Sequence, residues 1–90
     1  MNEFQTKCKA LVERILGEKR LHVGFAEAGQ HERYLIAKLE LSGQTYEIYI
    51  YEDEAGMGVG DDWFICEKPD FSSTDELMAA FGRILSEKIR

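Results

Sequence analysis

Residues 34–53 read YLIAKLELSGQTYEIYIYED. In the first half of this stretch every second residue is aliphatic, and in the second half the large apolar residues again fall at alternate positions. A two-residue period is typical of a β-strand that buries one face and exposes the other. The residues on the predicted inner face are Leu35, Ala37, Leu39, Leu41, Tyr46, Ile48 and Ile50.

Ser42 and Gly43 separate the two halves and predict a two-residue hairpin turn, because glycine tolerates the positive φ that such turns require. This turn sets a definite register, and a slip by one residue would expose the leucines to water. The predicted cross-strand pairs are Leu41–Gln44, Leu39–Tyr46, Lys38–Glu47, Ala37–Ile48, Leu35–Ile50 and Tyr34–Tyr51.

Outside the hairpin, apolar residues at helical spacing predict an amphipathic helix over residues 3–20, with Asn2 as its cap. Residues 21–28 predict a first strand. Residues 63–68 predict a last strand, with Phe64 and Cys66 facing inward and Pro69 ending it. Ser73 and Glu76 stand at capping-box spacing before a second amphipathic helix.

These elements predict an α+β fold in which residues 1–90 form a single domain. The expected architecture is a two-layer α/β sandwich, with a four-stranded antiparallel meander and the N- and C-terminal helices packed on one face. The element order is therefore α-β-β-β-β-α.

The stretch at 52–62 reads EDEAGMGVGDD and combines three alternate glycines with five acids. We expect it to be a mobile acidic loop, because glycine is costly to order and little here can be buried. Its spacing matches neither a phosphate-binding glycine loop nor a calcium-binding loop. The sequence therefore predicts no cofactor and no metal.

The net charge of −6 is concentrated in the middle of the chain. Between Glu47 and Asp62 there are six acids and neither lysine nor arginine. Such a field repels nucleic-acid phosphates and favours a basic partner. The chain carries no apolar run of membrane-spanning length and no leader pattern, so we expect a soluble, cytoplasmic protein that binds no membrane.

Catalytic motifs are missing from the sequence. His22, His31 and Cys66 have no partner at a recognisable spacing, and the distance between Cys8 and Cys66 along the chain indicates two buried thiols rather than a disulfide or zinc site. We expect a non-enzymatic protein with no catalytic residues. A small enzyme or ligand-binding domain that uses His22, Cys66 and the carboxylates is the alternative.

The outer face of the predicted sheet carries aromatic residues bordered by acids, a combination enriched at protein interfaces. If both helices cover the other face, these side chains are free to bind a protein partner with a basic surface, or a second copy of the chain in a homodimer. The predicted partner-binding residues are Tyr34, Glu47, Tyr49, Tyr51, Asp53, Asp61, Asp62 and Trp63.

The order of helix, strands and helix resembles the double-stranded-RNA-binding domain. That family opens its second helix with a lysine-rich phosphate clamp, whereas this chain has Ser73-Thr74-Asp75-Glu76-Leu77 there. Direct RNA binding is therefore not expected. The outline also resembles small acidic phage inhibitors of the anti-CRISPR kind, compact secretion chaperones and toxin-immunity proteins. A second hypothesis is an anti-CRISPR-like inhibitor whose acidic stretch imitates nucleic-acid phosphates and blocks a nucleic-acid-binding protein.

Overall fold

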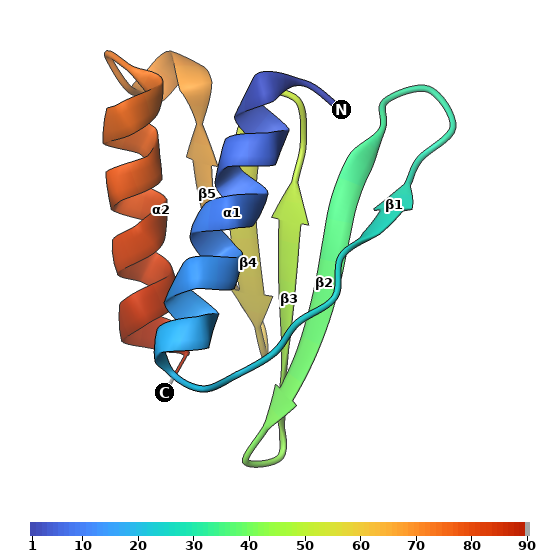
Figure 1. Ribbon diagram of the computed structural model, residues 1–90, viewed down its shortest axis with the longest axis vertical. Helices are drawn as coiled ribbons and strands as arrows, with labels where there is room; N and C mark the ends of the chain where they lie inside the picture. The colour runs from blue at the N-terminus through green and yellow to red at the C-terminus, as the bar shows by residue number, and fades with distance from the viewer. Residues whose placement is uncertain (90) are drawn as a thin grey trace.

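The computed structural model describes residues 1–89 and contains two long helices, five strands and one short 3-10 helix (Figure 1). The elements are, in chain order, α1 (Glu3–Glu18), β1 (Ala26–Ala28), β2 (Tyr34–Leu41), β3 (Gln44–Ile50), β4 (Glu54–Val59), β5 (Asp62–Glu67), η1 (Lys68–Asp70) and α2 (Thr74–Lys88).

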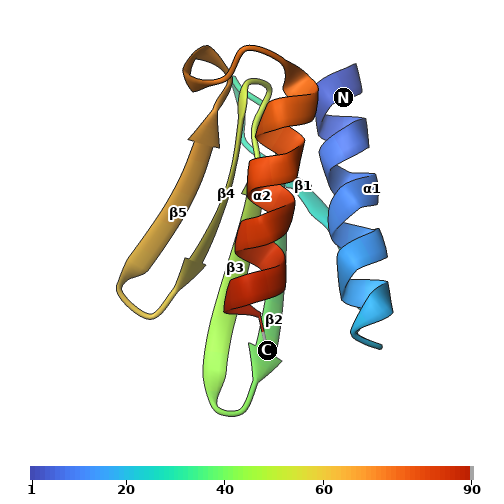
Figure 2. The same cartoon turned by 90° about the vertical axis from the view of Figure 1, so that its left-hand side faces the viewer.

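The five strands form one antiparallel meander, in which each strand pairs with the next along the chain. Both helices lie on the same side of this sheet, as Figure 2 shows. The predicted α+β class and two-layer arrangement are confirmed, and the sheet has one strand more than the four expected.

The register of the central hairpin is as predicted from the sequence. The structure pairs Leu35 with Ile50, Ala37 with Ile48, Lys38 with Glu47, Leu39 with Tyr46 and Leu41 with Gln44. Ser42 and Gly43 both adopt a positive φ, of 52° and 80°, which is the turn geometry that matches the twist of the two strands. The alternation of apolar residues therefore determined which face of the hairpin is buried.

Both helices begin at the predicted caps. The Asn2 side chain accepts a hydrogen bond from the backbone N–H of Gln5, and the Gln5 side chain accepts one from the backbone N–H of Asn2. The buried Gln5 also donates from Nε2 to the carbonyl oxygen of Arg33 at 2.9 Å, which ties α1 to the start of β2. At α2, the Ser73 hydroxyl oxygen accepts a hydrogen bond from the backbone N–H of Glu76.

The predicted first strand, residues 21–28, is mostly wrong. Only Ala26–Ala28 pairs with β2, and the segment before it crosses the inner face of the sheet below α1 (Figure 1). Val23 is buried in the core, and Leu21 and Phe25 pack against it. Leu21, Val23 and Phe25 thus cover a part of the inner face of the sheet that the helices leave uncovered. Because every second side chain of this extended segment points toward the sheet, its apolar residues alternate as they would in a strand.

The predicted mobile loop at 52–62 is also wrong. Residues 54–59 form β4, which is an interior strand between β3 and β5. Ala55 and Met57 are each 0% exposed and face the core, so the alternate apolar side chains can be buried after all. The glycines at 56 and 58 occupy the opposite face of the strand, beneath side chains of β5.

The core lies between the helices and the inner face of the sheet. It includes Leu16 from α1, Ile48 from β3, Met57 from β4 and Phe81 from α2, all fully buried. Cys66 is buried and Phe64 partly buried against the core, as predicted for the inner face of β5. Neither helix in residues 1–89 is long and apolar enough to cross a membrane.

Candidate functional site: an aromatic sheet face

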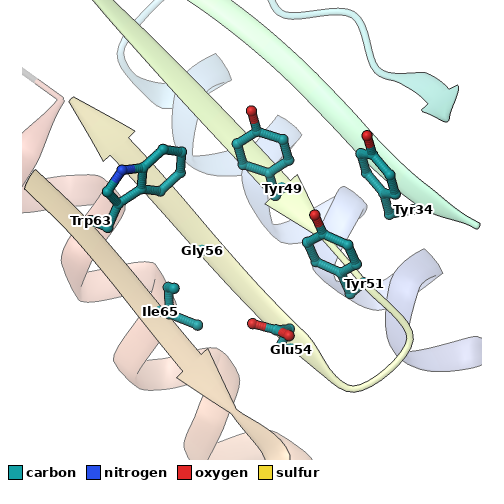
Figure 3. A pocket seen from close by; sticks show the side chains of 7 residues that line it. All are labelled: Tyr34, Tyr49, Tyr51, Glu54, Gly56, Trp63 and Ile65. Carbon is teal, nitrogen blue, oxygen red and sulfur yellow. The ribbon is translucent and has the colours of Figure 1, made fainter. Parts of the chain in front are cut away.

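The outer face of the sheet carries a connected cluster of four aromatic rings, from Tyr34, Tyr49, Tyr51 and Trp63, which we call the aromatic face. The ring centroids of Tyr34 and Tyr51 lie 4.7 Å apart, and those of Tyr49 and Trp63 lie 5.6 Å apart. Tyr49 lies 6.1 Å from Tyr34 and 6.3 Å from Tyr51. The cluster thus runs from β2 across to β5, on the side of the sheet that the helices leave uncovered (Figures 2 and 3).

Tyr34 comes from β2, Tyr49 from β3 and Tyr51 from the residue directly after β3, and the ring of Tyr51 is nearly parallel to each of the other two. Tyr49 and Tyr51 are inclined by only 18°, and Tyr34 and Tyr51 by 28°. These positions follow from the alternation on β2 and β3, since Tyr34 and Tyr49 lie on the face opposite Leu35 and Ile50. The hairpin register therefore determines that the tyrosines gather on one surface.

A hollow of about 450 Å³ lies within the aromatic face. Gly56 of β4 lines it and contributes no side chain, so the rings of Tyr49 and Tyr51 stand on one side and Trp63 and Ile65 on the other (Figure 3). Glu54 adds a carboxylate at the start of β4. Within the part of the chain that the structure describes, the hollow is thus lined by aromatic and aliphatic groups, one acid and no base.

Trp63 and Ile65 are unusually exposed for large apolar residues, at 54% each. Both belong to β5, which forms one edge of the sheet. Large apolar side chains that remain in water beside other aromatic rings are characteristic of surfaces that bind a partner.

Glu47 holds the hydroxyl group of Tyr49 in place. The Tyr49 hydroxyl donates a hydrogen bond to Oε2 of Glu47 at 2.6 Å. This hydrogen bond, followed by desolvation and the nearby negative charge, raises the pKa of Tyr49 to about 12. Tyr49 is therefore a neutral phenol with a determined orientation at physiological pH.

Glu54 lies in an environment that disfavours its negative charge. Desolvation by the surrounding side chains raises the pKa of this carboxyl group, and repulsion from Glu67, Asp53 and Glu32 adds to the effect. Among residues 1–89, no lysine or arginine lines the hollow to compensate for this charge. Desolvation also raises the pKa of Tyr51, with Tyr34, Glu54 and Glu32 contributing.

The acids predicted to form one loop are divided between two turns. Asp53 lies in the turn between β3 and β4, whereas Asp61 and Asp62 lie where the chain turns into β5. Because β4 separates these turns, they are about 17 Å apart along the strand. Of the eight predicted partner-binding residues, the four aromatic residues and Glu47 therefore share one surface. The three aspartates lie at the two ends of that surface.

Four residues that build this site were missed from the sequence: Glu54, Gly56, Gly58 and Ile65. All four belong to β4 or β5, and their positions depend on recognising β4 as a strand. The available signal was the alternation of Glu54, Gly56 and Gly58 with the apolar Ala55, Met57 and Val59.

The residues considered for catalysis are not gathered at this site. Cys66 is buried on the inner face and His22 is exposed, and neither lines the hollow of the aromatic face. Burial raises the pKa of both Cys8 and Cys66, in the case of Cys8 to about 12. Within residues 1–89, no three side chains of histidine, cysteine, aspartate or glutamate gather closely enough to hold a metal ion.

Comparison of the chain with models of known protein families, with curated proteins and with solved structures gave no match.

Proposed function

We propose that the protein is a small non-enzymatic interaction module that binds a protein partner with a basic surface through the aromatic face. The observation that carries this proposal is the cluster of Tyr34, Tyr49, Tyr51 and Trp63 on the side of the sheet that neither helix covers. Aromatic side chains contribute large contact areas at a low cost in conformational entropy, and they dominate binding energies at many interfaces.

The charge of the face favours a basic partner. Glu47 and Glu54 lie on it, and Glu67 lies on the same face of β5, directly opposite Glu54 in the register. Carboxylates at the border of an apolar patch steer a basic partner and accelerate its association. In a homodimer built on this face, the carboxylates of two copies would face each other, and such like-charge contacts oppose association.

The proposal is tested by capture from the native host with wild-type protein and with a Tyr49→Ala/Tyr51→Ala variant as bait. We expect a specific partner with the wild type and about a hundredfold or more weaker binding with the variant, because each aromatic hot spot that is truncated costs about 2 kcal/mol or more and a hundredfold corresponds to about 2.7 kcal/mol. Glu13→Ala, on the exposed side of α1, is the control and should bind as the wild type does. Circular dichroism verifies that the variants are folded.

Charge reversal distinguishes this proposal from a nucleic-acid mimic. Replacing Asp53, Asp61 and Asp62 with lysine should slow association with the partner in our proposal, whereas it should abolish binding if these acids imitate phosphates. Light scattering after size exclusion tests for the homodimer. Equal binding by the wild type and the tyrosine variant would contradict the proposed interface.

A further inference from the structure

The hollow of the aromatic face has the composition of a cation-binding site. Tyrosine and tryptophan rings attract cations through the negative potential of their faces, and a carboxylate adds a full negative charge. Tyr49, Tyr51 and Trp63 supply the rings and Glu54 the carboxylate. The volume of about 450 Å³ falls within the range of about 300–1,000 Å³ found for ligand pockets.

None of the described residues places a positive charge beside the Glu54 carboxylate in the hollow. This carboxylate is partly desolvated and repelled by Glu67, Asp53 and Glu32, which together raise its pKa. A bound cation would remove this unfavourable interaction. Electrostatics therefore favour a positively charged group rather than a neutral one beside Glu54.

The arrangement of the rings favours a planar cation. The rings of Tyr34, Tyr49 and Tyr51 are inclined to one another by no more than 45°, and two of the three pairs by less than 30°. The Tyr51 ring is thus nearly parallel to each of the other two tyrosine rings, whereas the Trp63 ring is tilted by 41° from that of Tyr49. A nearly parallel ring face at Tyr51 suits a flat cation better than a spherical ammonium group. A guanidinium group is flat, stacks on aromatic faces, is weakly hydrated and binds a carboxylate through two parallel N–H groups.

We propose that the hollow binds the guanidinium group of an arginine side chain presented by the protein partner, with its plane against the ring of Tyr51 and its N–H groups donating to Glu54 beside it. This inference rests on the proposed function, since the arginine belongs to that partner. It restricts the proposed partner to a protein whose basic surface carries an arginine that can reach into the hollow.

The chain contains one tryptophan, so Trp63 reports on the hollow through its fluorescence and its indole N–H resonance. The probes are the blocked tripeptides acetyl-Gly-Arg-Gly-amide, acetyl-Gly-Lys-Gly-amide and acetyl-Gly-citrulline-Gly-amide. Citrulline retains the shape of arginine but carries no charge. We expect the arginine peptide to bind roughly tenfold more tightly than the citrulline peptide at low salt, and more tightly than the lysine peptide.

Two variants test which groups make the contact. Glu54→Gln keeps the size of the side chain and removes its charge, so the preference for arginine over citrulline should fall severalfold. Tyr51→Leu keeps apolar bulk and removes the ring, so it should weaken arginine binding as well. Glu13→Gln makes the same change of charge on the exposed side of α1 and should leave binding unchanged.

Equal binding of the arginine and citrulline peptides, or equal binding by wild type and Glu54→Gln, would overturn the inference. Tighter binding of the lysine peptide would also overturn it. If the tyrosine double variant loses its partner but no arginine peptide binds, the arginine site is excluded and the proposed interface stands. If the arginine peptide binds but the partner binds the tyrosine double variant as tightly as the wild type, the proposed interface is excluded instead.

Discussion

The indole ring of Trp63 lies directly over Gly58, its cross-strand neighbour in the sheet. A Cβ atom added to Gly58 would come within 2.7 Å of a carbon atom of that ring, which is closer than non-bonded carbon atoms approach. The missing side chain at position 58 therefore allows Trp63 to lie flat on the sheet beside Tyr49. Gly56, two residues earlier, leaves the adjacent space that becomes the hollow.

Gly58→Ala should displace the Trp63 ring and separate it from Tyr49. We expect a clear change in tryptophan near-ultraviolet circular dichroism, with a loss of stability below about 1.5 kcal/mol, the upper range for an aromatic pair. Gly24→Ala is the control, because a Cβ atom there meets nothing within 4 Å. Unchanged tryptophan spectra in Gly58→Ala would contradict the contact.

The central hairpin could be predicted from the sequence because its pattern is redundant. Alternation, the Ser42-Gly43 turn and the opposite charges of Lys38 and Glu47 all specify the same register. The strand β4 could not be recognised in the same way, because its outer positions are glycines and its flanks are acidic. Glycine reduces strand propensity when the backbone is considered alone. In the folded protein, the ring of Trp63 covers Gly58 and compensates for the missing side chain.

Met57→Ala tests whether β4 is an interior strand. Met57 is 0% exposed, so its truncation should leave a cavity and lower the free energy of unfolding by about 2–5 kcal/mol. Ile65→Ala, on the exposed face of β5, is the control and should cost less than about 1 kcal/mol. Urea denaturation measures both values. Equal, small effects would indicate that residues 54–59 are not packed in the core.

The candidate site was predictable only in part, and for a physical reason. The tyrosines on β2 and β3 follow from the hairpin register, which depends on local alternation. The hollow requires that β4 brings Gly56 between Tyr49 and Ile65 and places Glu54 opposite Glu67, and this depends on the pairing of β3 with β4 and of β4 with β5. Because the glycines of β4 have low strand propensity, no local feature of residues 54–59 indicated that pairing.

Glu47→Gln should lower the pKa of Tyr49 from about 12 toward the ordinary value of 10, because the carboxylate that accepts the phenol proton is lost. In the wild type, the stability that the raised pKa supplies is present below pH 10 and is lost as the pH rises through about 12. Tyrosine ring resonances followed by NMR up to pH 11 measure the difference. The Tyr49→Phe variant identifies which resonance belongs to Tyr49. If Tyr49 titrates with the same pKa in the wild type and in Glu47→Gln, the hydrogen bond is contradicted.

Glu54→Gln should stabilise the protein at neutral pH while it weakens binding of the arginine peptide. The pKa of Glu54 is raised in the folded state, mainly by desolvation, so the folded protein binds this proton more tightly than the unfolded chain does. Its contribution to stability is fully present below the ordinary pKa of 4.5 and is lost as the pH rises through the raised value. The variant should therefore be more stable than the wild type at pH 7, by less than about 1 kcal/mol because solvent still screens this partly buried carboxyl group.

Thermal unfolding of the wild type and Glu54→Gln between pH 4 and pH 8 measures this effect, and the difference should vanish toward the acidic end. Glu13→Gln on α1 separates the local effect from the general loss of one negative charge. A variant that is less stable than the wild type at pH 7 would mean that Glu54 has a stabilising partner in the folded chain. The negative charge of Glu54 would then already be compensated within the folded chain, and it would not favour binding of a guanidinium group.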